Sequence, residues 1–123
     1  MQSKPVFLLT AIVGLFFGIS LMLFPEMILD LVEATYLNGG PAMARHAASW
    51  ILAASVFALF IRDLEHSETR QAVFIMFDIA FLLMVIAELF SYITGVANVM
   101  ILAIVALHVL FVLLYTYLFI ENR

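Results

Sequence analysis

Four long apolar segments restrict what this 123-residue chain can fold into. They cover about residues 6–24, 42–61, 72–94 and 98–120. The hydrocarbon core of a bilayer is about 30 Å thick, and an α-helix needs about 20 apolar residues to cross it. Backbone groups in lipid must find partners within the protein, and helices provide them. The sequence therefore predicts a single integral membrane domain over residues 1–123, an all-α, four-transmembrane-helix antiparallel bundle.

Composition excludes several other classes of protein. Hydrophobic residues make up 67% of the chain and charged residues 11%, whereas soluble domains have about 45–50% and about 25%. Lys and Arg total 5 against 9 Asp and Glu, without a basic cluster, so no nucleic-acid partner is expected. The absence of cysteine excludes disulfide scaffolds and thiol chemistry. The expected surrounding is the lipid bilayer.

The breaks between the apolar segments agree with four spans. Pro25 ends the first span, and the Asn-Gly-Gly-Pro run at 38–41 predicts a turn before the second. A charged loop occupies 62–70. Thr94 and Gly95 end the third span, and Asn98 can cap the fourth. Because this last loop is so short, the third and fourth spans must form a tight antiparallel hairpin.

Residues 25–37, between the first two spans, predict a short amphipathic helix at the outer interface. Glu26, Asp30 and Glu33 recur at i, i+4 and i+7, on one helical face. The segment is acidic, so attraction to anionic lipid is not its expected role. Two interpretations remain: a connector that caps the bundle, or a lid over a pocket that opens outward.

Positive charge predicts the orientation of the chain. Lys4, Arg62, Arg70 and Arg123 fall on one side of a four-span arrangement, and Arg45 alone falls near the other. Cytoplasmic loops carry the excess of Lys and Arg. We therefore expect both termini in the cytoplasm. The first span is longer than a signal-peptide core and three more follow, so it is interpreted as a retained helix.

Gly14 and Gly18 form a G-x-x-x-G motif on the first span. This spacing places both glycines on one face and lets another backbone approach closely. Small residues on the second span offer matching surfaces: Ala44 with Ala48, and Ser49 with Ala53. Two interpretations of the motif remain. It could pack tightly within the chain, or it could form the contact in a homo-oligomer or larger membrane complex.

Arg45 and Glu88 are predicted to form an ion pair in the outer leaflet. A charged group near mid-membrane costs about 2.5–3.5 kcal/mol on insertion scales, so each should have a partner. At about 1.5 Å per residue, their depths differ by about 5 Å. Residues of similar depth complete a predicted polar cluster, either structural or ligand-binding: Arg45, His46, Ser49, Trp50, Glu88 and Tyr92.

A second intramembrane polar site is predicted around Asp78, with His108 and Tyr115 on the fourth span. Arg62 could extend back toward Asp78. Asp78 is interpreted as a protonated or hydrogen-bonded structural acid, and the alternative is a proton-coupled site.

Two histidines on separate spans, His46 and His108, raise the possibility of haem b. Their expected depths differ by about 9 Å along the membrane normal, and ligation from both sides of an iron needs nearly equal depth. Neither haem nor another cofactor nor a metal ion is therefore expected. No sequence motif places a nucleophile beside an oriented base, so no catalytic residue is predicted.

Two functions rank first after these exclusions, and an enzyme or cofactor carrier ranks third. The first is a non-enzymatic accessory or scaffold subunit that acts through helix–helix packing. The alternative is a binder or carrier of a small apolar ligand, such as a lipid, sterol or quinone. Its pocket would lie between the second, third and fourth spans beneath the connector, with Arg45 and Glu88 as polar anchors.

The layout resembles the DoxX-like group of small four-helix membrane proteins, which are largely uncharacterised. The resemblance lies in Leu23-Phe24-Pro25-Glu26, then Ala44-Arg45, then Arg62 at the inner end of the second span. Trp50 and the Ala87-Glu88 pair are also similar in placement to landmarks of the Erg28-like sterol-pathway scaffold proteins. Both resemblances imply an integral membrane protein, and neither supplies a catalytic residue.

Overall fold

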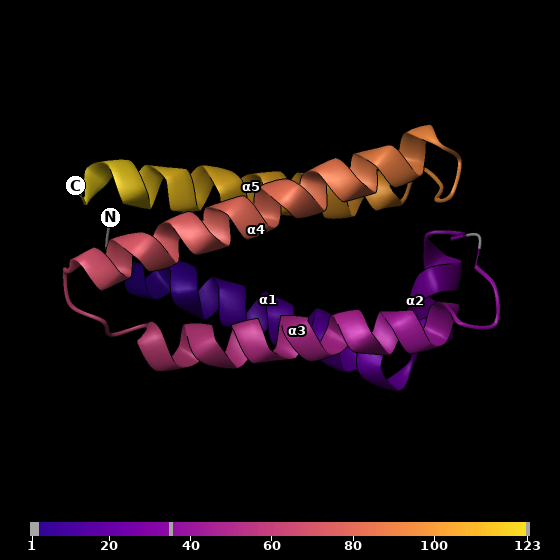
Figure 1. Cartoon of the computed structure of the whole chain (residues 1–123), viewed down its shortest axis with the longest axis horizontal. Helices are drawn as coiled ribbons and strands as arrows, with labels where there is room; N and C mark the ends of the chain where they lie inside the picture. The colour runs from indigo at the N-terminus through magenta and orange to yellow at the C-terminus, as the bar shows by residue number, and fades with distance from the viewer. Residues whose placement is uncertain (1–2, 35, 123) are drawn as a thin grey trace.

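The computed structural model describes residues 3–34 and 36–122, and that part of the chain is helical without strands. Its helices are α1 (Ser3–Leu23), α2 (Pro25–Leu31), α3 (Gly40–Ile61), α4 (Glu68–Ile93) and α5 (Ile101–Glu121), shown in Figure 1. All except α2 are long and apolar enough to cross a membrane. The predicted all-α bundle of four antiparallel spans is confirmed.

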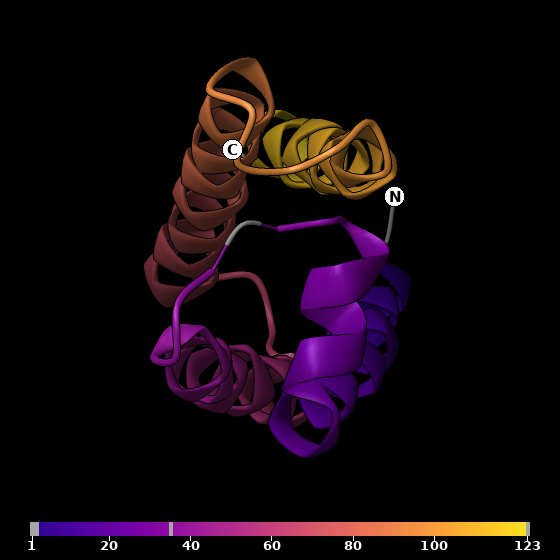
Figure 2. The same cartoon turned by 90° about the vertical axis from the view of Figure 1, so that its right-hand side faces the viewer.

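The four long helices form two antiparallel pairs. Helix α1 packs along α3, and α4 packs along α5. Figure 2 shows the two pairs end-on, with α1 and α3 below and α4 and α5 above. Between the pairs, only α1 and α5 bring their backbones close together among the described helices. Side chains therefore provide most of the contact between the pairs.

Gly14 and Gly18 explain the close packing of α1 on α3. A Cβ atom on Gly14 would overlap the hydroxyl of Ser55, and one on Gly18 would lie 2.8 Å from Leu52 side-chain carbons. The residues of α3 that face the two glycines are Ile51, Leu52 and Ser55, and the buried residues of α3 are all small: Ala44, Ala48, Ser55 and Ala58. The G-x-x-x-G motif thus lies inside the chain, against the partner helix of its own pair.

An aromatic cluster joins the two pairs in the half of the bundle nearest the chain termini. The ring of Tyr115 on α5 stacks on Phe77 of α4, with centroids 5.0 Å apart. Phe7 of α1 stacks on Phe74 of α4 at 5.7 Å, and Phe57 of α3 on Phe77 at 6.4 Å. Offset and stacked rings are favourable beyond the area they bury. All four spanning helices therefore contribute to one core.

A buried hydrogen bond crosses this core. The hydroxyl groups of Thr10 on α1 and Tyr115 on α5 lie 2.8 Å apart, and both residues are buried. Neither hydroxyl has access to water, so each satisfies the other. The bond fixes α5 relative to α1.

Replacement of Tyr115 by Phe should lower the free energy of unfolding by about 1 kcal/mol, because the Thr10 hydroxyl loses its partner. The double replacement Thr10→Val with Tyr115→Phe should recover most of that loss, since no buried hydroxyl is left unpaired. Denaturation from mixed micelles measures both. A double variant less stable than Tyr115→Phe alone would contradict this account.

The connector between α1 and α3 is shorter than predicted. Helix α2 ends at Leu31, whereas the sequence predicts a helix over about 25–37; residue 35 lies outside the described residues. The cause is Glu33, whose φ of 48° is left-handed and incompatible with continuing a helix. After α2, the carbonyl of Val32 accepts a hydrogen bond of 2.8 Å from the Asn98 amide. The connector thereby ties the first pair to the α4–α5 turn.

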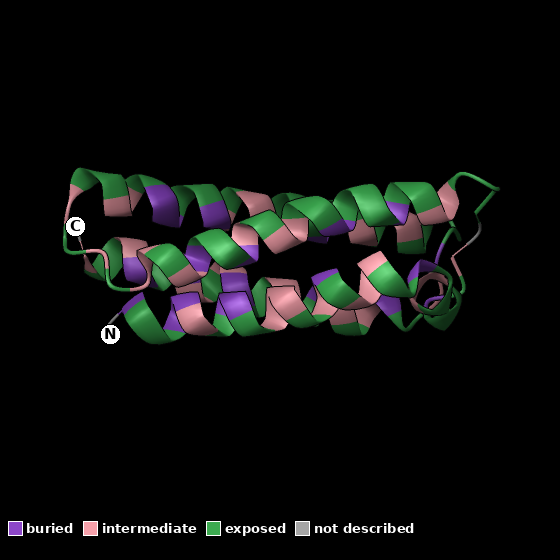
Figure 3. Ribbon diagram, turned by 90° about the horizontal axis from the view of Figure 1, so that it is seen from below, coloured by how far each residue is buried: buried purple, intermediate pink, exposed green. Residues whose placement is uncertain are grey.

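The starts of the four spanning helices differ from the predicted boundaries by two to four residues. Helix α4 begins at Glu68, four residues early, because the Ser67 hydroxyl accepts the Arg70 amide at 3.2 Å and caps it. Helix α5 begins at Ile101, since the Asn98 side chain accepts the Met100 amide at 2.8 Å in a preceding turn. Gly95, at the end of α4, has a φ of 72° that suits glycine. Exposed residues, most of them apolar, run along the full length of the spanning helices (Figure 3).

Candidate functional site

The predicted ion pair between Arg45 and Glu88 is wrong. The Nε atom of Arg45 donates to the carbonyl of Met22, at the end of α1, across 3.3 Å. Glu88 lies on α4, which does not come close to α3 along the described backbone. Arg45 therefore holds the end of α1 against the start of α3.

Glu88 instead pairs with His108 of α5. The Nδ1 atom of His108 lies 2.9 Å from Oε1 and 3.0 Å from Oε2 of Glu88. The two side chains are 17% and 18% exposed. The ring of Phe81 lies 5.6 Å from the imidazole and shields it on one side. A carboxylate and an imidazole at this distance satisfy one another within an apolar span.

The second predicted polar site is divided between two partners. Asp78 on α4 accepts the Thr116 hydroxyl of α5, 3.1 Å from each carboxyl oxygen. Tyr115 bonds Thr10, and His108 bonds Glu88. Asp78, His108 and Tyr115 thus form no common site. Thr116 was missed in the sequence, although it follows Tyr115, the residue whose depth matches that of Asp78.

The remaining members of the predicted outer cluster lie on exposed surfaces. His46, Ser49 and Trp50 are exposed on α3, and Tyr92 is exposed on α4. The Ser49 hydroxyl donates to the Arg45 carbonyl, within its own helix, at 3.0 Å. The indole of Trp50 is 69% exposed. These residues do not converge with Glu88 on one cluster.

A third polar connection between α4 and α5 lies at the terminal end of the bundle. Arg70 donates to the Asn122 side chain at 3.0 Å, and the Gln71 amide donates to the Asn122 carbonyl. With the two pairs described above, it makes three polar contacts along one helical hairpin. Such contacts hold neighbouring helices in register in lipid. The three contacts therefore hold α4 and α5 in a fixed register.

The sequence predicts a charged loop over 62–70, and the structure shows which charges contact one another there. Arg62 pairs with Asp63 at 3.3 Å and donates to the Leu59 carbonyl at 3.3 Å. These contacts of Arg62 do not include Asp78, the partner that the sequence left possible for it. Lys4 of α1 contacts Asp63 at 2.7 Å. The signal that could have located this cluster is the common membrane side predicted for Lys4, Arg62 and Arg70.

Two open cavities also lie at this terminal end. Each has Arg62 and Asp63 in its lining. The apolar-ligand pocket expected between α3, α4 and α5 beneath the connector would lie at the opposite end. In the described ranges, no three acidic or histidine side chains gather as metal ligands do. His108 is bonded to Glu88 and His46 lies on the exposed face of α3, and the expectation that no haem binds stays a prediction.

The helices and their apolar surface define a multi-pass membrane protein of the four-helix class. No known protein family, curated protein or solved structure matches the chain. The DoxX-like and Erg28-like resemblances therefore stay predictions from the residues quoted for them.

Proposed function

We propose that this protein is a non-enzymatic accessory or scaffold subunit, which packs against a membrane-spanning helix of another subunit through the outward face of α3. The observation that carries the proposal is Trp50. Its 69% exposed indole lies at the middle of α3, whereas tryptophan is usually enriched at the membrane interfaces. An indole N–H in hydrocarbon has no water to bond, so an acceptor on a neighbouring helix would stabilise it.

Small residues beside Trp50 also support the proposal that this face of α3 contacts another subunit. Ser49 and Ala53 are four residues apart and exposed, a small-xxx-small spacing that lets a second helix approach closely. Gly14 and Gly18, another such pair, are already covered by α3 of the same chain. The exposed pair on α3 is therefore our choice for the contact between subunits. His46, one turn from Trp50, adds a polar group to this face.

Cysteine crosslinking tests the proposal directly, because the natural chain has no cysteine. Ala53→Cys should crosslink to a second subunit in the membranes of cells that make the protein. A dimer of this chain and a conjugate with another membrane protein both place a partner on α3. The matched control is Ala87→Cys, an exposed alanine on α4, which should give no specific conjugate.

A bulky residue in place of Ser49, in the pair formed by Ser49 and Ala53, provides a second test of the proposed contact. Adding Ser49→Ile to Ala53→Cys should reduce the crosslinked fraction at least about tenfold, since a β-branched side chain prevents close approach. Equal crosslinking from Ala53→Cys and Ala87→Cys would contradict the proposal. Conjugates that persist unchanged with Ser49→Ile would contradict it as well.

The proposed orientation places both termini in the cytoplasm. Lys4, Arg62 and Arg70 lie at one end of the bundle, around a common cavity, and Arg45 lies near the other. The excess of positive charge at the terminal end supports the cytoplasmic side for it. The small, all-helical architecture is also compatible with the DoxX-like resemblance.

A further inference from the structure

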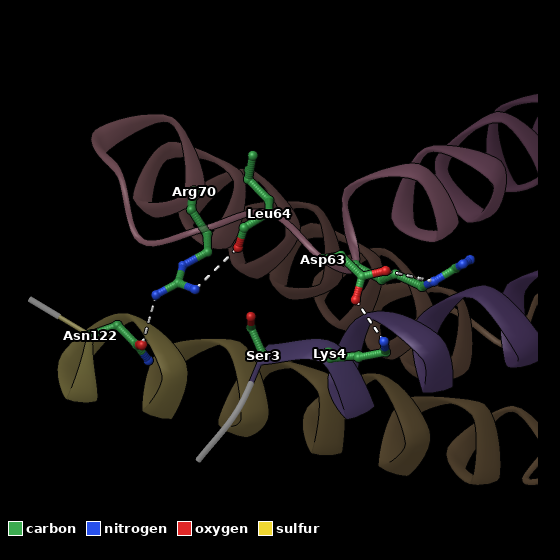
Figure 4. Close-up of a pocket in the computed structure, with 7 residues that line it drawn as sticks. Ser3, Lys4, Asp63, Leu64, Arg70 and Asn122 are labelled. Carbon is green, nitrogen blue, oxygen red and sulfur yellow. Dashed lines mark hydrogen bonds and ion pairs between the residues drawn. The ribbon is translucent and has the colours of Figure 1, made fainter.

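A basic cavity of about 490 Å³ opens at the terminal end of the bundle. Three cationic side chains line it, from α1, the end of α3 and α4: Lys4, Arg62 and Arg70. Asp63, Ser3 and Asn122 complete most of its polar wall. Figure 4 shows these groups around the opening between the α3–α4 loop and the end of α5. Lys4 and Arg70, which are 66 positions apart in the sequence, thus line the same cavity.

The one acid in this lining is already engaged by two cations. Asp63 lies 2.7 Å from the Lys4 ammonium and 3.3 Å from Nε of Arg62. Its hydrogen bond with Lys4 holds the pKa of the Asp63 carboxyl below its usual range. Three positive charges against one negative charge leave the lining with an excess of two. The cavity therefore favours an anion.

Arg70 is fixed in place without a carboxylate partner among its described contacts. Its guanidinium donates to three neutral acceptors: the Leu64 carbonyl at 3.2 Å, Nδ1 of His66 at 3.1 Å and the Asn122 side chain at 3.0 Å. Its Nε atom is buried and has no hydrogen-bond partner in the described part of the chain. The ring of Phe74 lies 5.8 Å from the guanidinium carbon. A positioned, uncompensated guanidinium suits a phosphate group.

An apolar cavity of about 460 Å³ adjoins the basic one. Val56, Leu59 and Phe60 of α3 line it, and it shares Arg62 and Asp63 with its neighbour. The Phe60 side chain is 83% exposed. A charged space next to an apolar strip on a spanning helix matches a molecule with an anionic head and a hydrocarbon tail.

We propose that this end of the protein binds an anionic phospholipid. The phosphate lies in the basic cavity against Arg70 and Lys4, and an acyl chain follows α3 past Phe60. A free phosphate ion would use the basic cavity alone. The shared Arg62 and the adjoining apolar strip favour a lipid, because one ligand then occupies both cavities. Basic pockets between spanning helices are a known form of headgroup site.

Native mass spectrometry of the intact chain tests this proposal. The protein in mild detergent receives equal amounts of phosphatidylglycerol and phosphatidylcholine, which differ in net charge. We expect preferential retention of phosphatidylglycerol. Arg70→Gln and Lys4→Gln should each reduce that retention about fivefold. Arg45→Gln, the matched control, also removes one positive charge but lies at the other end, and should leave retention unchanged.

Two further measurements make the test independent of the stability of the Arg70 variant. Asp63→Asn removes the acid from the cavity and should raise phosphatidylglycerol retention. Inorganic phosphate at millimolar concentration should not displace the lipid. Equal retention of the two lipids, complete displacement by phosphate, or the same loss from Arg45→Gln as from Lys4→Gln would each overturn the proposal.

Discussion

Replacement of His108 by Leu is expected to lower the free energy of unfolding by about 3 kcal/mol. The change leaves the Glu88 carboxyl in the apolar span with its 2.9 Å partner removed. Glu88 is 18% exposed, so little solvent replaces the lost imidazole. Removing one member of a buried hydrogen-bonded pair costs more than the pair contributes, because the remaining polar group is left without a partner. Unfolding from mixed micelles provides the measurement.

The double variant Glu88→Leu with His108→Leu separates pairing from packing. With both polar groups replaced by apolar ones, stability should return to within about 1 kcal/mol of the natural chain. Asp78→Leu serves as a comparison, because its partner Thr116 is a neutral hydroxyl that needs no counter-charge. If the double variant is as unstable as His108→Leu alone, the pair is not the source of the loss.

Gly14→Leu should destabilise the α1–α3 pair by about 3 kcal/mol. The first side-chain atom would already overlap the Ser55 hydroxyl. Ser55 is buried and its hydroxyl donates to the Ile51 carbonyl within α3, so it has no free space to rotate into. The helices must therefore separate. A lower unfolding free energy, measured by the same denaturation, is the expected signature.

A pair of smaller changes tests the geometry of this contact. Gly14→Ala alone should cost about 1–2 kcal/mol, and adding Ser55→Ala should recover most of it, since the overlapping hydroxyl is removed. Gly39→Ala is the control, because a Cβ atom there meets nothing within 4 Å, and should cost less than about 1 kcal/mol. Additive losses from Gly14→Ala and Ser55→Ala would disprove the contact.

The fold was predictable because span length and hydropathy are set by the bilayer rather than by tertiary detail. The α4–α5 hairpin was predictable for a related reason, since a short turn leaves the two helices no other arrangement. Partner choice was harder. Counting residues along each span placed Arg45 and Glu88 at similar depths in the membrane. Depth alone does not specify which helices are neighbours. The hairpin constraint could have pointed to a partner for Glu88 on α5, and His108 is that partner.

The basic cavity was only partly visible in the sequence. The distribution of Lys and Arg placed Lys4, Arg62 and Arg70 on one side of the membrane. Their convergence depends on how α1 packs against α3 and on how the loop from 62 to 67 folds over Ser3 and Asn122. Neither the helix packing nor the loop conformation leaves a periodic pattern in the sequence. The same limit applies to Ser49 and Ala53, whose outward direction follows from which face of α3 packs against α1.

The division into two helical pairs has a consequence for how the chain is made. Each pair joins segments that are close in sequence, α1 with α3 and α4 with α5. As the ribosome adds residues, the first pair can complete its glycine-mediated contact before the second has been synthesised. The late step is the closing of the aromatic layer between the pairs, where Phe7 packs on Phe74 and Phe57 on Phe77. Membrane insertion can then proceed as two successive hairpins, with their association in the bilayer as the final event.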